Sequence, residues 1–176
     1  HRYLKQCLPF ANNLLWIQST AGGVDRLPQE ELAEKGVILT NMTSAAETIA
    51  RHAVTLAWSI NRGLPNFWQQ QKQGVWHQPH QWLPYPQKSL VFGMGSIGMA
   101  IAKILAAEGI EVNGVRRTPS IESIPPFKKV FYDGSWLDEL SSIDWCFLAL
   151  PNTPETQNLF DKKVLSHLPV HGIVIN

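Results

Sequence analysis

The sequence predicts an α/β fold in which a doubly wound parallel sheet is flanked by helices. In the second half of the chain, short apolar strands alternate with helical segments, and this alternation is typical of a parallel sheet. A glycine-rich turn directly follows the first of these strands and opens a helix. The composition, 44% hydrophobic and 16% charged, is that of a globular protein and excludes a disordered chain or a coiled coil.

The first half of the chain predicts two short strands, each followed by a helix. The expected elements are a strand over 14–17, a helix over 27–35, a strand over 37–39 and a long helix over 44–62. Gly36 follows the first helix and Gly63 the second, and glycine is common just after a helix ends. Pro65 is expected to prevent the long helix from continuing.

Residues 66–87 are dense in Gln, Trp, His and Pro and predict a connecting segment. A continuous helix or central strand is excluded by its prolines, Pro79, Pro84 and Pro86. An unanchored linker would hardly carry several tryptophans. We therefore expect this segment to lie against the body of the protein through Trp68, Trp76 and Trp82.

From Lys88 onward the expected strands and helices alternate. The strands cover 89–92, 111–115, 129–132 and 145–150, with a last one at Ile173, and the helices cover 97–108, 136–140 and 161–168. Consecutive strands joined through helices lie parallel in one sheet, and ligands of such sheets bind at the carboxyl ends of the strands.

The glycine-rich turn is the motif that carries chemistry. Gly93 permits a tight turn, Gly95 allows a pyrophosphate to approach the backbone, and Gly98 lets the helix pack closely on the sheet. The amides of Ser96 and Ile97 then face the phosphates at the positive end of the helix. The spacing and context predict a dinucleotide site of the Rossmann type; the alternative is a purely structural turn.

The end of the next strand indicates which dinucleotide is bound. An NAD site has an acidic residue there, but this chain has Arg116, Arg117 and Thr118, with no acid before Glu122. Two guanidinium groups and a hydroxyl suit a 2′-phosphate, which a carboxylate would repel. We therefore expect NADP rather than NAD as the cofactor. The alternative is that these residues form a solvated basic turn.

Several separated motifs, in the same order, resemble the D-isomer-specific 2-hydroxyacid dehydrogenase family. They are 16–25 (WIQSTAGGVD), 39–41 (LTN), 49–52 (IARH), 61–65 (NRGLP), 93–98 (GMGSIG), 144–156 and 172–176 (GIVIN). The basic residues after the second strand are similar to those of the NADPH-using glyoxylate and hydroxypyruvate reductases in that family.

The resemblance implies a discontinuous substrate domain of flavodoxin-like fold, into which the dinucleotide domain is inserted. Residues 1–41 would be the C-terminal part of the first substrate-domain segment. Residues 42–87 would be an interdomain helix and connector, and 88–176 a dinucleotide-binding domain that is incomplete at its C-terminal end. The intact protein is expected to be a homodimer, with the helix over 44–62 near the twofold contact.

The resemblance also assigns site residues outside the glycine turn. The turn Ala21-Gly22-Gly23 matches the loop whose backbone amides bind the substrate carboxylate, and bare amides suit an anion. Positions lining the cofactor cleft are matched by Leu150, Pro151 and Thr156. The family's catalytic Arg, His and Glu match no position in this chain. These residues alone are therefore expected to bind cofactor without turning substrate over.

The sequence thus predicts an NADP(H)-dependent oxidoreductase that reduces small 2-oxo acids, such as glyoxylate or hydroxypyruvate, to D-2-hydroxy acids. The alternative is a non-catalytic module that senses nicotinamide cofactor, as a corepressor does. A formal net charge of +1, with both signs scattered along the chain, gives no reason to expect nucleic acid or a membrane as partner.

Three further expectations come from residue types and from the chain ends. Only two cysteines are present, which favours a reducing, cytoplasmic compartment. No cysteine or carboxylate joins His77 and His80, so no metal site is predicted. The chain begins with His1 and ends on a predicted core strand at Asn176, and we interpret both ends as cut.

Overall fold

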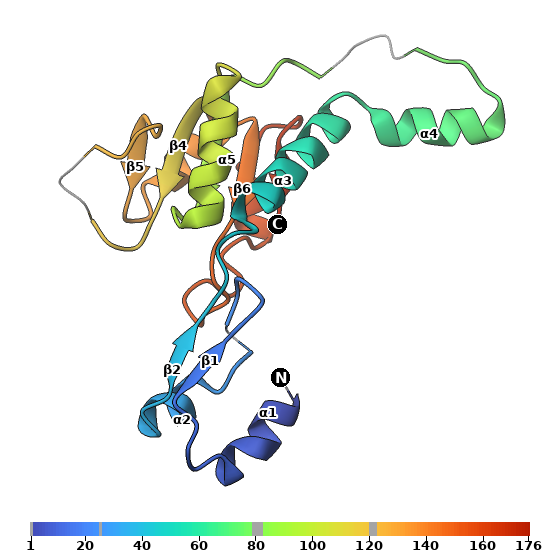
Figure 1. Ribbon diagram of the computed structural model, residues 1–176. Helices are drawn as coiled ribbons and strands as arrows, with labels where there is room; N and C mark the ends of the chain where they lie inside the picture. The colour runs from blue at the N-terminus through green and yellow to red at the C-terminus, as the bar shows by residue number, and fades with distance from the viewer. Residues whose placement is uncertain (1, 25, 79–82, 120–122) are drawn as a thin grey trace. The chain divides into compact units, whose positions relative to one another are not determined.

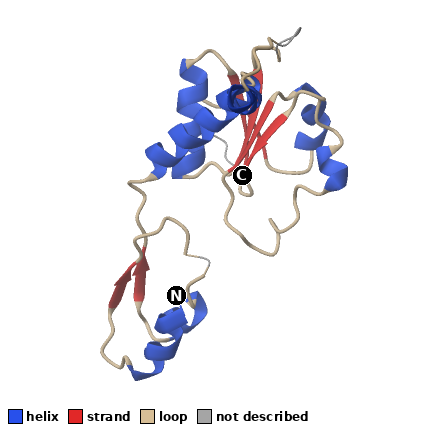
Figure 2. Cartoon of the chain, turned by 90° about the vertical axis from the view of Figure 1, so that its right-hand side faces the viewer, coloured by secondary structure: helices blue, strands red, loops and turns tan. Residues whose placement is uncertain are grey.

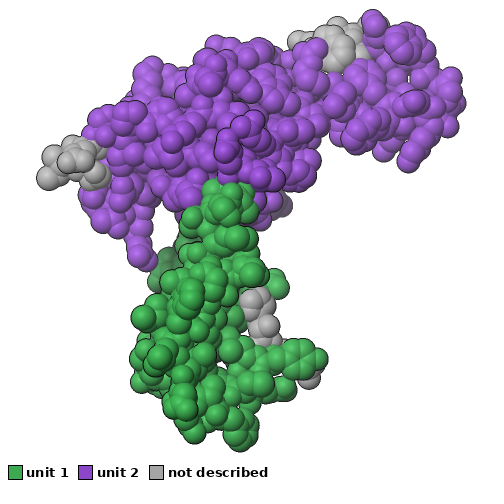
Figure 3. Space-filling model, in the orientation of Figure 1, with its two compact units in different colours: residues 1–46, 151–157 green, residues 47–150, 158–176 purple. Residues whose placement is uncertain are grey.

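The computed structural model describes residues 2–24, 26–78, 83–119 and 123–176. Its internal contacts divide the chain into two compact units (Figure 3). Unit 1 comprises residues 1–46 and 151–157, and unit 2 comprises residues 47–150 and 158–176. Each unit has its own buried apolar cluster. The domain boundaries at residues 41 and 87 stay a prediction.

Unit 1 is a small α/β unit with two parallel strands. Its elements are α1 (Arg2–Cys7), the 3₁₀ turn η1 (Leu8–Phe10), β1 (Trp16–Gln18), α2 (Gln29–Glu34) and β2 (Ile38–Thr40). The strands pair in parallel with Trp16 opposite Ile38. A core of Leu8, Leu32 and Val37 holds the helices to the sheet. The predicted strands and helix lie here within two residues of their expected bounds, whereas α1 was not predicted.

Unit 2 contains a five-stranded sheet in which every pair of neighbouring strands is parallel (Figure 1). Its strands are β3 (Lys88–Phe92), β4 (Glu111–Val115), β5 (Lys129–Phe131), β6 (Trp145–Leu148) and β7 (Ile173–Ile175). Their spatial order is β5-β4-β3-β6-β7. The chain thus builds the sheet outward from β3 in one direction, returns, and builds outward again from β6, as a doubly wound fold does.

Helices cover both faces of this sheet (Figure 2). One face packs on α3 (Ala46–Asn61) and α5 (Ser96–Ala107), and the other on α6 (Trp136–Glu139), the 3₁₀ turn η2 (Leu140–Ser142) and α7 (Lys162–Leu165). Successive residues of β3 alternate between these two cores: Val91 lies in the first, Leu90 and Phe92 in the second. The Rossmann-like fold class that the sequence predicted is confirmed.

The connecting segment differs from its prediction. A helix, α4 (Leu64–Gln73), begins where the sequence predicted only a terminated helix, because Pro65 lies in the first turn of α4. Proline is tolerated there since a first-turn amide has no helical acceptor. The expected packing through tryptophans is wrong for Trp68 and Trp76, which are 61% and 89% exposed. Trp82 lies outside the described residues.

The returning part of the segment, just before β3, is what contacts the body. The Tyr85 ring lies 5.2 Å from that of Trp58, which in turn meets the buried Trp145 edge-on at 4.9 Å. The Asn61 amide donates to the Pro84 carbonyl at 3.0 Å. These contacts fix the entry to β3, the strand that leads to the glycine-rich turn.

Among the described residues, no helix combines the length and apolarity that crossing a bilayer requires.

Candidate functional site

The carboxyl ends of three neighbouring strands meet at one edge of the unit 2 sheet. The Gly93 amide, just after β3, donates to the Val115 carbonyl at the end of β4 (2.9 Å). The Ala149 amide, just after β6, donates to the Phe92 carbonyl (2.8 Å). The turns after β3, β4 and β6 therefore start at the same level. The strand order reverses between β3 and β6, and doubly wound sheets bind ligands at such a switch point.

Two of the predicted glycines are required by close backbone contacts. Gly93 has a φ of +89°, and a Cβ on it would come 2.4 Å from the Ala149 carbonyl oxygen. A Cβ on Gly98 would come 1.8 Å from the Gly93 carbonyl oxygen. Helix α5 therefore approaches the end of β3 as closely as its backbone allows, which is the packing that the sequence predicted for Gly98.

Gly95 is different, because no close contact within the protein requires a glycine at this position. A Cβ there would meet no atom within 4 Å, and its φ of −77° suits any residue. A glycine that the protein's own packing does not require is consistent with one that leaves room for a ligand. The predicted approach of a pyrophosphate to this backbone therefore fits the structure.

The first turn of α5 presents amides without acceptors. Within the helix the first amide to find an acceptor is that of Met99, which donates to Gly95. No described residue accepts from Ser96 or Ile97, no side chain caps the helix, and its first turn carries no acidic residue. These donors, at the positive end of a twelve-residue helix, suit phosphate oxygens.

Two side-chain contacts around this turn involve residues far apart in the sequence. A Cβ on Gly114 in β4 would come 2.8 Å from the Met94 sulfur, so Met94 packs directly on this strand. This contact was not predicted; the only sequence signal is a glycine inside a predicted strand. The Leu150 side chain lies on the other side of the turn, 3.3 Å from where a Gly93 Cβ would be.

The predicted basic residues begin directly after β4. The Arg116 amide donates to the Phe131 carbonyl of β5 (3.0 Å), which fixes the start of this segment. Arg116 is half-buried, while Arg117 and Thr118 are exposed. Neither guanidinium has an ion-pair partner among the residues that the structure describes. Both guanidinium groups are therefore available to bind an anion. Glu122 lies outside the described residues.

The Ala21-Gly22-Gly23 turn follows β1 in unit 1. The Ala21 amide donates to the Ser19 hydroxyl (3.2 Å), so a side chain already occupies this donor. The Gly22 carbonyl accepts from the Asn41 side-chain amide at 2.6 Å. The amides of Gly22 and Gly23 have no acceptor within the described part of the chain, and both residues are exposed.

The segment after β6 forms a turn of its own. The Thr156 hydroxyl donates to the Pro151 carbonyl at 2.6 Å and accepts from the Thr153 amide at 2.9 Å. Pro151 and Thr156 group with unit 1, together with the Ala21–Gly23 turn. The structure thus brings most predicted cofactor residues together in unit 2, namely Gly93, Gly95, Ser96, Ile97, Gly98, Arg116, Arg117, Thr118 and Leu150. Their roles in binding stay a prediction.

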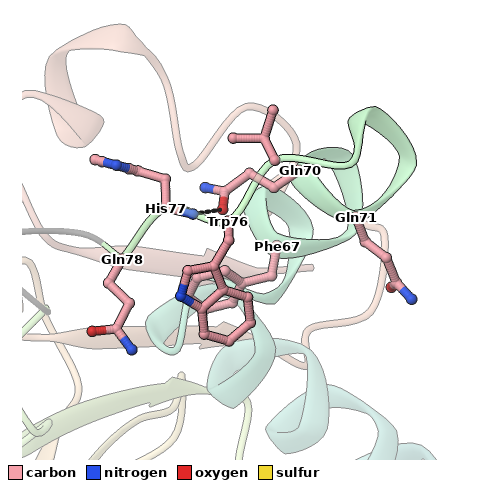
Figure 4. A pocket seen from close by; sticks show the side chains of 7 residues that line it. Phe67, Gln70, Gln71, Trp76, His77 and Gln78 are labelled. Carbon is pink, nitrogen blue, oxygen red and sulfur yellow. Dashed lines mark hydrogen bonds between the residues drawn. The ribbon is translucent and has the colours of Figure 1, made fainter.

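A cavity elsewhere in unit 2 offers no site of the same kind. It has a volume of about 400 Å³ and lies between α4 and residues 75–78, where the His77 amide donates to the Gln70 side chain (Figure 4). Its lining consists of apolar residues, glutamines and His77, without a lysine or arginine for a phosphate.

The described residues also offer no candidate site for metal binding or thiol chemistry. Over the described residues, no three His, Cys, Asp or Glu side chains gather as metal ligands do, and His80 lies outside them. Burial raises the pKa of the Cys146 thiol to about 12, so it is not a thiolate near neutral pH.

Comparison with known proteins finds similarity to D-isomer specific 2-hydroxyacid dehydrogenases. The family model described as D-isomer specific 2-hydroxyacid dehydrogenase, NAD binding domain, matches residues 54–176. The chain is 29% identical over 168 residues to glyoxylate/hydroxypyruvate reductase A of Arabidopsis thaliana, covering 93% of this chain and 52% of that protein. It is 24% identical over 164 residues to D-lactate dehydrogenase of Staphylococcus aureus, covering 91% and 48%.

Solved structures agree with these relatives. An NADPH-dependent glyoxylate/hydroxypyruvate reductase from Sinorhizobium meliloti, in complex with NADP and malonate, has a TM-score of 0.75 at 25% identity, over 93% of this chain and 51% of that one. A D-isomer specific 2-hydroxyacid dehydrogenase family protein from Aeromonas salmonicida has a TM-score of 0.76 at 31% identity, over 97% and 55%. The chain spans about half the length of the curated relatives it matches.

Proposed function

The chain belongs to the D-isomer specific 2-hydroxyacid dehydrogenase family, and we propose that it is the cofactor-binding part of an NADP(H)-dependent reductase of small 2-oxo acids. The observation that carries this proposal is the turn after β3. Its glycines pack against backbone at Gly93 and Gly98, while Gly95 and the amides of Ser96 and Ile97 face no protein partner among the described residues. A dinucleotide pyrophosphate supplies the oxygens that these amides would bind.

The preference for NADP rests on the residues after β4. Arg116 and Arg117 follow the strand next to β3, at the edge where the glycine turn lies. A 2′-phosphate would accept charge-assisted hydrogen bonds from their guanidinium groups, and Thr118 adds a hydroxyl donor. The S. meliloti reductase, whose structure contains NADP, supports this choice, and the family model, described as an NAD binding domain, keeps NAD as the alternative.

The substrate is proposed to be a small 2-oxo acid such as glyoxylate or hydroxypyruvate, as the names of the A. thaliana and S. meliloti reductases suggest. The turn after β1 would bind its carboxylate through backbone amides. A bound nicotinamide cofactor would supply the hydride needed to reduce the substrate carbonyl. Pro151 and Thr156 would line the cofactor cleft. The groups that bind and protonate the carbonyl match no residue of this chain, so the reaction is proposed for the whole protein.

The test is turnover by the full-length protein. NADPH oxidation with glyoxylate, hydroxypyruvate, pyruvate and phenylpyruvate should show activity with at least one substrate. The rate should be lower with NADH at the same subsaturating concentration. Absence of turnover across the panel, with cofactor binding intact, would contradict the reductase and favour a cofactor-sensing module.

We also propose that the intact protein is a homodimer through α3. One side of α3 packs on the sheet through Ala50, Val54 and Ala57. Another side leaves large apolar side chains 41–43% exposed, namely Ile49, Leu56 and Ile60. Positions spaced by seven and four residues lie on one side of a helix, so these three form a stripe that a second copy would cover.

Substituting Leu56→Glu should weaken the dimer by at least about tenfold, since it places a charge in the covered stripe. Sedimentation equilibrium of the full-length protein measures this. The control is Thr55→Glu, an exposed position on a different side of the helix. A monomeric unmodified protein, or equal effects of the two variants, would contradict the proposed contact.

A further inference from the structure

The contacts of Asn41 connect two sequence motifs that are nineteen residues apart. Asn41 comes directly after β2, and its side-chain amide donates to the Gly22 carbonyl at 2.6 Å. The Gly22 Cα also lies close to the segment that follows β2, because a Cβ there would be 3.5 Å from the Met42 carbonyl oxygen. The end of β2 therefore supports the turn that follows β1.

A second contact holds the start of the same turn. The Ser19 hydroxyl accepts from the Ala21 amide and lies 3.1 Å from the Ala21 carbonyl. The Ser19 amide donates to the Thr40 carbonyl (2.7 Å), and Ser19 is only 9% exposed. Ser19 thus belongs to the packed end of β1. Because its hydroxyl already accepts from the Ala21 amide, that amide is not free to bind a ligand.

The bond to the Gly22 carbonyl determines where the next amide points. Gly22 and Gly23 share a trans peptide, in which the carbonyl and the N–H point in opposite directions. When Asn41 holds the Gly22 carbonyl toward β2, the Gly23 amide is directed away from β2. Glycine has little intrinsic preference for one peptide orientation, so a side-chain contact is needed to select it.

We propose that Asn41 is a positioning residue of the substrate turn: it orients the Gly22–Gly23 peptide, so that the amides of Gly22 and Gly23, and not that of Ala21, bind the substrate carboxylate. This inference rests on the proposed function. Without Asn41 the peptide would lose the side-chain contact that selects its orientation, and the substrate would have to order it on binding.

Asn41→Ala in the full-length protein tests this with steady-state kinetics. The KM for glyoxylate or the best 2-oxo acid should rise about tenfold, the effect of one lost hydrogen bond and its ordering, while the KM for NADPH stays unchanged. The matched control is Asn13→Ala, an exposed asparagine of the same unit with no hydrogen bond to a described residue. A substrate KM within twofold of the unmodified protein, or an equal rise in Asn13→Ala, would overturn the inference.

A second measurement needs no destabilising variant. Titration of the ¹⁵N-labelled full-length protein with malonate, as a carboxylate probe, should shift the amide resonances of Gly22 and Gly23 more than that of Ala21. A larger shift at Ala21 would overturn the assignment. If Asn41→Ala does not fold, Asn41→Leu, which has a side chain of similar size without the amide donor, should raise the substrate KM in the same selective way, and no change there would contradict the inference. If the unmodified protein has no 2-oxo acid turnover, the proposed function itself fails and takes this inference with it.

Discussion

The two glycine-containing turns of this chain keep their shape by different means. In unit 2, the turn after β3 is held by backbone packing: a Cβ on Gly93 or Gly98 would overlap backbone atoms at 2.4 and 1.8 Å. In unit 1, the turn after β1 is held by side chains, because a Cβ on Gly22 would meet nothing nearer than 3.5 Å, while Ser19 and Asn41 bond its backbone.

This difference shows what each motif can tolerate. A turn built by backbone packing cannot accept a side chain without moving a helix or a strand. A turn held by hydrogen bonds tolerates a methyl group but depends on the residues that donate and accept those bonds. Backbone packing thus requires glycine at Gly93 and Gly98, whereas it does not require glycine at Gly22.

Gly98→Ala should have the largest effect. Its Cβ would lie 1.8 Å from a backbone oxygen, so α5 must move, and we expect a loss of about 3 kcal/mol or more in the free energy of unfolding. Urea or thermal unfolding measures this. The control is Gly22→Ala, for which a loss below about 1 kcal/mol is expected. Equal losses in the two variants would contradict the contrast between the turns.

Gly95→Ala should affect binding and leave folding nearly unchanged. No protein atom lies within 4 Å of the new Cβ, so stability should change by less than about 1 kcal/mol. The Cβ would stand where the pyrophosphate is expected, and the Kd for NADPH should rise by about a hundredfold. Calorimetric titration gives the Kd, and Gly134→Ala is a control glycine that is equally open. Unchanged affinity would mean that the turn is only structural.

Arg116→Asp should change selectivity between cofactors. The substitution removes a cation and adds a carboxylate, so the ratio of the Kd values for NADPH and NADH should shift toward NADH by about tenfold or more. Fluorescence titration with both cofactors measures the ratio, and Lys128→Asp, at the opposite end of the sheet, is the charge-matched control. An unchanged ratio would indicate a solvated basic turn.

The smallest effect concerns the opposite end of β4 from the glycine turn of unit 2. The hydrogen bond from Lys128 (2.6 Å) holds the pKa of Glu111 below its usual value of 4.5. A lowered pKa in the folded state gives stability that is present above pH 4.5 and is lost as the pH falls through the folded-state value. Because Lys128 is 66% exposed, this amounts to less than about 1 kcal/mol. Lys128→Met should flatten the acid limb of the stability profile, and a profile that stays the same would contradict the pair's contribution.

The sequence predicted the fold of unit 2 well because its signals are local. The strand over 111–115 has the predicted bounds, and the turn glycines lie where their spacing places them. The prediction missed α4 because Pro65 was interpreted as ending one helix, although it lies in the first turn of another. The tryptophans of the connecting segment were expected to pack against the body of the protein, but Tyr85 makes that contact instead.

The parts of the candidate site that sequence reasoning missed are contacts between distant residues. Met94 meets Gly114 across the turn, and Asn41 meets Gly22 across nineteen residues. No local signal identifies the partner in either pairing, because each pairing depends on which strands become neighbours. Motif spacing indicates which backbone groups are available to a ligand; the register of the strands determines which side chains orient them.

The most direct test of the central claim, that the edge of unit 2 binds NADP, is thermal unfolding of this chain with NADPH, with NADH and with neither. At about a hundred times its Kd, a ligand adds roughly 2.7 kcal/mol to the stability of the folded state. We predict a clear rise in Tm with NADPH, a smaller rise with NADH at the same concentration, and loss of both rises in Gly95→Ala. No rise with either cofactor, or equal rises that persist in Gly95→Ala, would contradict the account.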